Sequence, residues 1–223
     1  MPDETCQTPS AQAAPGRPAG LVLVATPIGN LQDLSPRAVA ALRAADTLLC
    51  EDTRVTARLC AVFDITATRL TLHDHNEQAR IGQVLRLLGQ GRRVALVSDA
   101  GTPLVSDPGF RLVRAVLAAG LPVDAVPGAN AALLALTLSG LPPQPFLFVG
   151  FLPPRTAARR VVLARLRSAE RAGLAATLLI YEAPHRLAAT LSTCLDPRQR
   201  WRHSVRRRVR EEASCGDAPL LQS

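Results

Sequence analysis

The segment from Val97 to Gly109 reads V-S-D-A-G-T-P-L-V-S-D-P-G and places two aspartates among prolines and glycines. It follows an apolar run, residues 94–97. Because proline and glycine interrupt both strands and helices, we expect a strand that gives way to a rigid, exposed loop. Open α/β sheets bind ligands at the carboxyl ends of their strands. The aspartates are therefore candidate ligand-binding groups, and turn or helix-capping residues are the alternative.

Three further segments have the same character: A-T-P-I-G-N from Ala25, V-P-G-A-N from Val126 and Y-E-A-P-H-R from Tyr181. Each of them follows an apolar run. One such loop would be an ordinary turn. Four loops at the ends of strands indicate a single site that is assembled from separate parts of the chain.

Composition narrows the class of protein. Hydrophobic residues make up 48% of the 223 and charged residues 20%, as in ordinary globular proteins. The five cysteines form no C-x-x-C pair, which argues against structural zinc and disulfides and favours a reducing cytoplasm. No apolar run is long enough to span a bilayer. The absence of lysine and of a G-x-G-x-x-G sequence excludes the standard phosphate loops.

The formal net charge is +8, and every one of the 26 basic residues is arginine. This charge suits an anionic partner such as RNA, and GC-rich codon usage is the alternative explanation. Aromatic residues make up only 3%, which argues against a base-stacking RRM or OB-fold platform.

Short apolar strands alternate with helical patterns, which predicts an α/β fold with a mainly parallel sheet covered by helices on both faces. The predicted strands are residues 21–25, 47–50, 70–72, 94–97, 123–126, 146–149 and 176–181. The predicted helices are 37–45, 55–62, 77–89, 110–119, 129–139, 155–172 and 185–195. Ser35 and Pro36 form a predicted helix start, and Asn76 is a predicted cap.

We expect four regions along the chain. Residues 1–19 form a disordered leader, and 20–127 a complete N-terminal α/β domain. Residues 128–195 form a partial C-terminal α/β domain, and 196–223 an aberrant arginine-rich tail around Trp201.

Six motifs, in one order, closely resemble the ribosomal RNA branch of the tetrapyrrole (corrin/porphyrin) methylase superfamily. They are A-T-P-I-G-N-L-x-D-L-S-P-R-A, C-E-D-T-R, H-D-H-N-E, the loop from Val97, V-P-G-A-N-A and Y-E-A-P-H-R. The resemblance runs over about residues 21–195. Each motif alone is modest, but six in register are highly specific.

The resemblance implies S-adenosylmethionine-dependent 2′-O-methylation of a cytidine ribose in the 16S rRNA of the small ribosomal subunit. It also implies a two-domain tetrapyrrole-methylase-like fold with a cleft between the domains, a cytoplasmic homodimer, and no membrane or metal. The implied cofactor contacts include a hydrogen bond from the methionine ammonium to Asp99. The cofactor-binding candidates are Thr26, Pro27, Ser98, Asp99, Ala100, Gly101, Thr102, Pro103, Pro127, Gly128, Ala129 and Tyr181.

The catalytic candidates on the substrate side are Asn30, Glu51, Asp52, Arg54 and His75. Segment 51–54 would orient the ribose or a phosphate, and a capped helix start with an internal salt bridge is the alternative. A neutral histidine could serve as base, with a surface loop as the alternative. The RNA-binding candidates are Arg54, His73, Asn76, Arg155, His185 and Arg186. Arg159 and Arg160 are weaker phosphate candidates, because a solvated helix face also explains them.

The chain departs from the family after about residue 195, where no R-E-L-T-K segment or further strands follow. We therefore expect a truncated or frameshifted C-terminus, an incomplete second domain with an exposed apolar patch, and impaired activity. The alternatives are a tetrapyrrole or corrin methyltransferase, which H-D-H-N-E and Y-E-A-P-H-R disfavour, and a non-catalytic rRNA-binding remnant.

Overall fold

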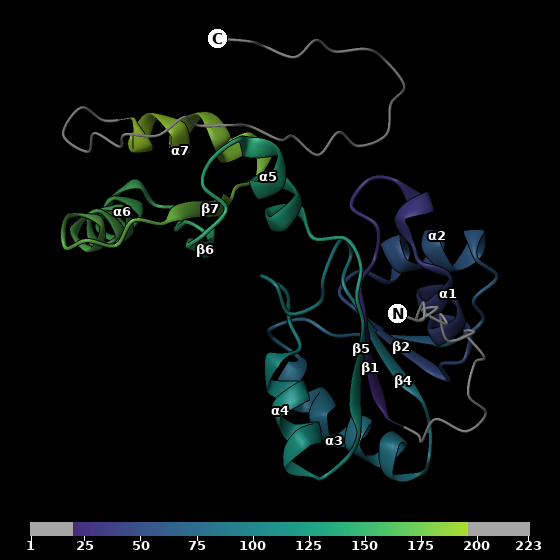
Figure 1. Cartoon of the computed structure of the whole chain (residues 1–223). Helices are drawn as coiled ribbons and strands as arrows, with labels where there is room; N and C mark the ends of the chain where they lie inside the picture. Colours follow the sequence, from purple (N-terminus) through teal and green to yellow (C-terminus); the bar gives the residue numbers. More distant parts are fainter. Residues whose placement is uncertain (1–19, 196–223) are drawn as a thin grey trace, which may run out of the picture.

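The computed structural model describes residues 20–195 and shows two lobes, each built around its own sheet (Figure 1). The predicted leader, residues 1–19, and the predicted tail, residues 196–223, lie outside the described residues.

The first lobe alternates strands and helices as the sequence predicted. Its strands are β1 (Leu21–Val24), β2 (Thr47–Cys50), β3 (Thr68–Thr71), β4 (Val94–Val97) and β5 (Val123–Val126). Its helices are η1 (Leu31–Asp33), α1 (Pro36–Arg43), α2 (Thr53–Val62), α3 (Glu77–Gly89) and α4 (Phe110–Ala118). The strands pair in parallel in the order β3-β2-β4-β1-β5. All five therefore end at one edge, and the loops after the central strands β1 and β4 start side by side.

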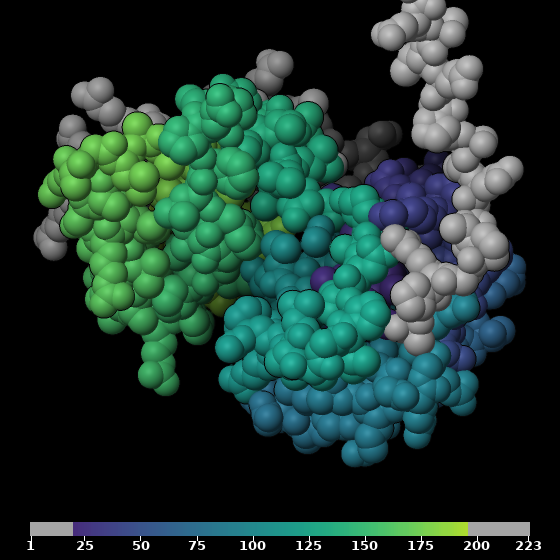
Figure 2. All heavy atoms as spheres, turned by 60° about the horizontal axis from the view of Figure 1, so that its bottom comes forward, coloured from purple at the N-terminus to yellow at the C-terminus, as the bar shows by residue number. Residues whose placement is uncertain are grey.

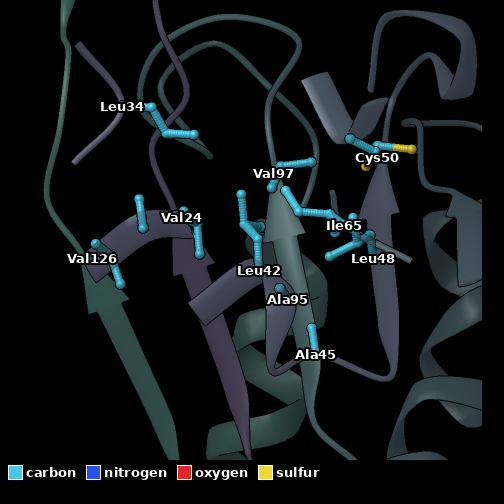
Figure 3. Close-up of a cluster of buried hydrophobic side chains, with 12 residues drawn as sticks. Val24, Leu34, Leu42, Ala45, Leu48, Cys50, Ile65, Ala95, Val97 and Val126 are labelled. Carbon is cyan, nitrogen blue, oxygen red and sulfur yellow. The ribbon is translucent and has the colours of Figure 1, made fainter. Parts of the chain in front are cut away.

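Neighbouring residues on each strand face opposite helical layers. Leu48 of β2 packs with Leu42 of α1 on one face (Figure 3), whereas Leu49 packs with Leu112 of α4 on the other. All four side chains are fully buried. Each such burial contributes about 1.5–3 kcal/mol, so the two layers hold the sheet edge in place.

Helix α1 begins as predicted. Ser35 accepts a hydrogen bond from the Ala38 N–H at 3.1 Å, and Pro36 occupies the first helical position. Both residues suit a helix start, because serine satisfies a free N–H group and proline has none to satisfy.

The start of α3 differs from the prediction. Asn76 precedes the helix but makes no capping hydrogen bond. Its side chain instead accepts from the His73 N–H at 2.9 Å and donates to the Thr71 carbonyl at 3.2 Å, which closes the β3–α3 turn.

Glu77, the first residue of α3, caps a different helix. Its side chain is buried, and Oε1 accepts a hydrogen bond from the Leu112 N–H in the first turn of α4 at 2.9 Å. The residue before α4 is Gly109, which has no side chain to cap with. The carboxylate therefore supplies the missing cap and also suits the positive end of the helix dipole.

The second lobe contains α5 (Ala131–Ser139), β6 (Phe146–Phe151), α6 (Thr156–Arg171), β7 (Thr177–Tyr181), η2 (Pro184–Arg186) and α7 (Leu187–Cys194). Strands β6 and β7 form a two-stranded parallel sheet. Several apolar side chains on α5 and β6 are exposed, among them Leu133, Leu138, Phe146 and Phe151. They lie in the second domain, where an exposed apolar patch was expected. Among residues 20–195, no helix is both long and apolar enough to cross a membrane.

Arg159 is buried, with 2% of its surface exposed. It is therefore neither the phosphate contact nor the solvated surface residue that the sequence left open. Its guanidinium donates to Thr193 Oγ1 at 2.9 and 3.1 Å and to the carbonyls of Pro154 and Ala189. It thereby joins α6 to α7 and to the loop after β6, which is a structural role.

We expect Glu77→Ala to lower the free energy of unfolding by about 1–3 kcal/mol, because the Leu112 N–H would lose a buried charged acceptor. Urea unfolding monitored by circular dichroism measures the change. Gln78→Ala, at the next and exposed position of the same helix, is the matched control. Equal stability of the two variants would show that the cap contributes nothing.

Candidate functional site

The loops after β1 and β4 are joined by buried hydrogen bonds. The Thr26 N–H donates to the Gly101 carbonyl at 2.8 Å, and the Gly101 N–H donates back to the Thr26 carbonyl at 3.0 Å. Thr26 Oγ1 donates to the Ser98 carbonyl at 3.0 Å, and Ser98 Oγ to the Gly101 carbonyl at 2.7 Å. Thr26 and Ser98 therefore use their hydroxyl groups to hold the two loops together.

The loop after β5 joins the same assembly. Thr102 Oγ1 donates to the Ala129 carbonyl at 3.0 Å and accepts from Asn130 Nδ2 at 3.3 Å. A Cβ atom at Gly128 would lie 2.9 Å from the Ala25 Cβ, so only glycine allows this approach to the end of β1. Pro127, Gly128 and Ala129 were cofactor-binding candidates, and in the structure Gly128 lies against Ala25.

The site lies at a point where the connections diverge. The helix after β1 covers one face of the sheet, whereas the helix after the adjacent strand β4 covers the other. Such a switch point leaves a crevice between neighbouring strand ends, which is where open α/β sheets bind ligands.

Asp99 connects this assembly to the loop after β2. Its Oδ1 accepts a hydrogen bond from the Asp52 N–H at 3.1 Å. Asp52 in turn caps α2 through the Arg54 N–H and pairs with the Arg54 guanidinium at 2.7 Å, which lowers the pKa of Asp52 to about 2. The capped helix start with an internal salt bridge, left open from the sequence, is therefore present.

Four carboxylates lie near one another at the sheet edge: Glu51, Asp74, Asp99 and Asp107. Burial and repulsion from the other three raise the pKa of Asp107 to about 6. Burial, together with repulsion from Asp99 and Asp74, also raises the pKa of Glu51. This concentration of negative charge favours a cationic ligand group.

The remaining substrate-side candidates, Asn30, His73 and His75, lie on the loops after β1 and β3. Asn30 is exposed and caps η1 through the Gln32 N–H. His75 is exposed, and its ring lies edge-on to His73 with the centroids 6.0 Å apart. The Nδ1 atom of His73 is buried and has no hydrogen-bond partner. Among the described residues, no group of three or more His, Cys, Asp and Glu side chains could hold a metal ion.

The second lobe approaches the loop after β4. A Cβ atom at Gly150 of β6 would lie 3.2 Å from Ser106 Oγ. The Tyr181 hydroxyl accepts from the Ala132 N–H at 3.2 Å, and its ring packs edge-on against Phe148 and Phe151. Figure 2 shows the furrow between the two lobes.

The predicted RNA contacts of the second lobe differ in exposure. Arg155 and His185 are exposed. Arg186 lies against the protein, where it pairs with Glu182 at 3.1 Å and donates to the Leu152 carbonyl at 2.6 Å. The structure thus gives Arg186 an internal role in holding the loop after β7.

A cavity of about 420 Å³ opens beside the acidic cluster, between the first turns of α3 and α4. Its lining is Asp74, Glu77, Asp107, Pro108, Gly109, Phe110 and Arg111. Of these residues, only Asp107 was a candidate ligand-binding group from the sequence, whereas Asp74 and Glu77 fall within H-D-H-N-E and were assigned no role. Turn formation or helix capping was the alternative for Asp107.

The other cofactor candidates line the joined loops. Pro103 is buried, Pro27 and Ala100 are half-buried, and Pro127 is exposed.

Residues 20–206 match the family described as tetrapyrrole (corrin/porphyrin) methylases. The chain is 51% identical over 172 residues to the ribosomal RNA small subunit methyltransferase I of Micromonospora olivasterospora, covering 77% of this chain and 53% of that protein. The same-named protein of Xylella fastidiosa is 51% identical over 175 residues, covering 78% and 62% respectively. The chain thus spans a little over half the length of these relatives.

Among solved structures, the crystal structure of the methyltransferase CobJ has a similar fold. The TM-score is 0.58 and the identity 23%, over 80% of this chain and 76% of that one. At this identity the likeness supports the fold alone.

We expect Asp107→Asn to stabilise the protein at pH 7.5 but little at pH 4. The folded pKa of about 6 lies above the ordinary value of 3.8, so stability is lost as the pH rises from 3.8 through 6. The neutral amide removes this loss. Urea unfolding at both pH values measures the change in the free energy of unfolding. Asp64→Asn is the control, because the Asp64 side chain is 88% exposed. Equal stabilisation at both pH values would contradict the assignment.

Proposed function

The chain belongs to the tetrapyrrole (corrin/porphyrin) methylase family, and on this basis we propose that it methylates RNA of the small ribosomal subunit. The methyl donor is S-adenosylmethionine, and the acceptor is the 2′-hydroxyl of a cytidine ribose. The observation that carries the proposal is the acidic cluster at the joined loops, in a chain whose relatives bear the name of rRNA methyltransferases.

The residues at the site fit the donor. S-adenosylmethionine carries a sulfonium and an ammonium against a single carboxylate, so it is a net cation. Burial and mutual repulsion raise the pKa values of Asp107 and Glu51, and the repulsion is relieved when a cation binds among them. Asp99 is the contact that we assign to the ammonium, because it already links the loops after β2 and β4. When bound, the donor supplies an electrophilic methyl group.

The chain's own contribution is mainly positioning. The hydrogen bonds among Thr26, Ser98 and Gly101 fix the floor of the site before any ligand arrives. Correct placement of two reactants is worth effective molarities of about 10⁵–10⁸ M. A rigid floor is therefore the main requirement of this reaction.

The ribose hydroxyl is a weak nucleophile, and a nearby base accelerates its attack by about 10²–10⁴-fold. Asp52 is poorly suited, because its pair with Arg54 holds its pKa at about 2. Glu51 is the better candidate, because its pKa is raised and its carboxylate holds a proton more readily. The half-buried Asp52 then holds the exposed Arg54 at the rim, where Arg54 faces the RNA backbone.

The proposal includes a homodimer and a cytoplasmic location, where ribosomal subunits are found. The exposed apolar side chains Leu138, Phe146 and Phe151 support a dimer, because contact with a second copy would cover such residues.

Asp99→Asn tests the donor site. The amide oxygen can still accept from the Asp52 N–H, but the negative charge is lost. We expect affinity for S-adenosylmethionine to fall about 5–100-fold, the scale of a charge-assisted hydrogen bond. Calorimetric titration measures the affinity, and Asp64→Asn is the control for removal of an exposed charge. An unchanged dissociation constant would remove Asp99 from the donor site.

Transfer of a labelled methyl group to isolated small subunits tests the acceptor. We expect label on the 2′-oxygen of a cytidine, identified after digestion to nucleosides, and RNA affinity that falls steeply with salt because arginine contacts release counterions. Label on a base, or on a corrin in place of RNA, would overturn the proposed acceptor. Retention of RNA without any transfer would point to a non-catalytic binding protein.

A further inference from the structure

The cavity between α3 and α4 adjoins the proposed methyl-donor site, and no occupant has been assigned to it so far. It measures about 420 Å³, within the range of about 300–1,000 Å³ that is typical of small-ligand pockets. It shares Asp74 and Asp107 with the acidic cluster, so an occupant would lie next to the reacting groups.

One side of the cavity is a solvent-facing aromatic ring. Phe110 is 62% exposed although it begins a helix whose other face is buried, so core packing does not explain it. The Arg114 guanidinium lies 5.7 Å from the ring centroid. A ring of this kind, flanked by a cation, is a common platform for nucleobases in single-stranded nucleic acid.

The polar lining of the cavity has a distinct pattern. Asp74 and Asp107 offer carboxylate oxygens, which accept hydrogen bonds, and Arg111 offers donors. Glu77 is already used, because it caps α4. Acceptors beside a donor match the edge of cytosine, whose amino group donates and whose N3 and O2 accept. Uracil presents a carbonyl where cytosine has the amino group, and would place it against the carboxylates.

The charges also indicate how a nucleotide would enter. The carboxylates disfavour a phosphate inside the cavity, whereas Arg111 and Arg114 lie in the first two turns of α4, beside Phe110. A base held in the cavity can therefore keep its phosphates against the arginines. Enzymes that act on a nucleotide in folded RNA commonly extrude it into such a pocket.

We propose that this cavity receives the target base of the RNA, with Phe110 stacking on it and Asp74 and Asp107 selecting the amino group of cytosine over the carbonyl of uracil. The inference rests on the proposed function and adds to it the residues that determine base specificity. The adenine of the methyl donor also carries an amino group and is therefore a second candidate occupant of the cavity. The experiment distinguishes the two bases.

The test compares small subunits that carry cytidine or uridine at the methylated position, with the donor at one fixed concentration. We expect the wild-type protein to prefer cytidine by about 10–100-fold, the scale of one good base contact. Asp74→Asn keeps the size of the side chain but adds a donor that suits uracil, so this preference should fall about tenfold or more. Because both substrates share the donor, a change in donor affinity cancels from the ratio.

Phe110→Leu is the second variant, and Leu117→Ala, an exposed apolar position on the same helix, is its control. Phe110→Leu should raise KM for the subunit about tenfold and leave the dissociation constant of S-adenosylmethionine unchanged. An unaltered cytidine preference in Asp74→Asn would overturn the proposal. Loss of donor affinity in Phe110→Leu with an unaltered KM would also overturn it and assign the cavity to adenine.

A direct titration separates failure of the pocket from failure of the proposed function. If the wild-type protein transfers no methyl group, calorimetric titration with cytidine and uridine 5′-monophosphates still tests the cavity. Preferential binding of the cytidine nucleotide that is lost in Asp74→Asn supports the pocket. Equal or absent binding of both nucleotides contradicts it.

Discussion

The hydrogen bonds between the loops after β1 and β4 are the constraint on which the rest of the site depends. Thr26 and Gly101 exchange backbone bonds, while Ser98 closes the same loop with its hydroxyl group. The Thr26 and Ser98 side chains are buried, so breaking these hydrogen bonds would leave polar groups without partners in the interior. Two further loops of the site are attached to this pair: the loop after β5 through Thr102, and the loop after β2 through Asp99.

This rigid frame explains how the protein can hold like charges together. Burial of Asp107 and its repulsion from nearby carboxylates raise its pKa to about 6, so the charged Asp107 opposes folding at neutral pH. A flexible loop would relax and let the carboxylates separate. Here Glu77 anchors the first turn of α4, and Leu104 and Ser106 are held at positive φ angles, a conformation that costs free energy for residues other than glycine. The β4 loop is thus held in place from both ends. Holding the carboxylates together lowers the stability of the fold but strengthens the binding of a cationic ligand.

The order and type of the elements could be predicted from the sequence because the local signals agree with the fold. Ser35 and Pro36 start α1 as predicted, and the apolar runs became parallel strands. Two structural roles were missed because the partners are distant in sequence. Glu77 caps a helix that begins 33 residues later, and Arg159 is buried against Thr193. No local pattern distinguishes such a buried charge from a solvated one. The cavity beside Phe110 escaped prediction for the same reason, because it forms only where two helices meet.

The distribution of charge also limits how RNA can reach the site. The floor is acidic and suits a cationic methyl donor, yet the same field repels phosphates. Positive groups occur instead at the periphery: Arg54, with 88% of its side chain exposed, on one side, and Arg111 and Arg114 on the other. An RNA backbone that follows these arginines would keep its phosphates outside and turn a single nucleoside inward. Under the proposed function, the ribose would meet the donor while the base enters the cavity, so the acidic floor and the basic rim together favour extrusion of one nucleotide over docking of a regular helix.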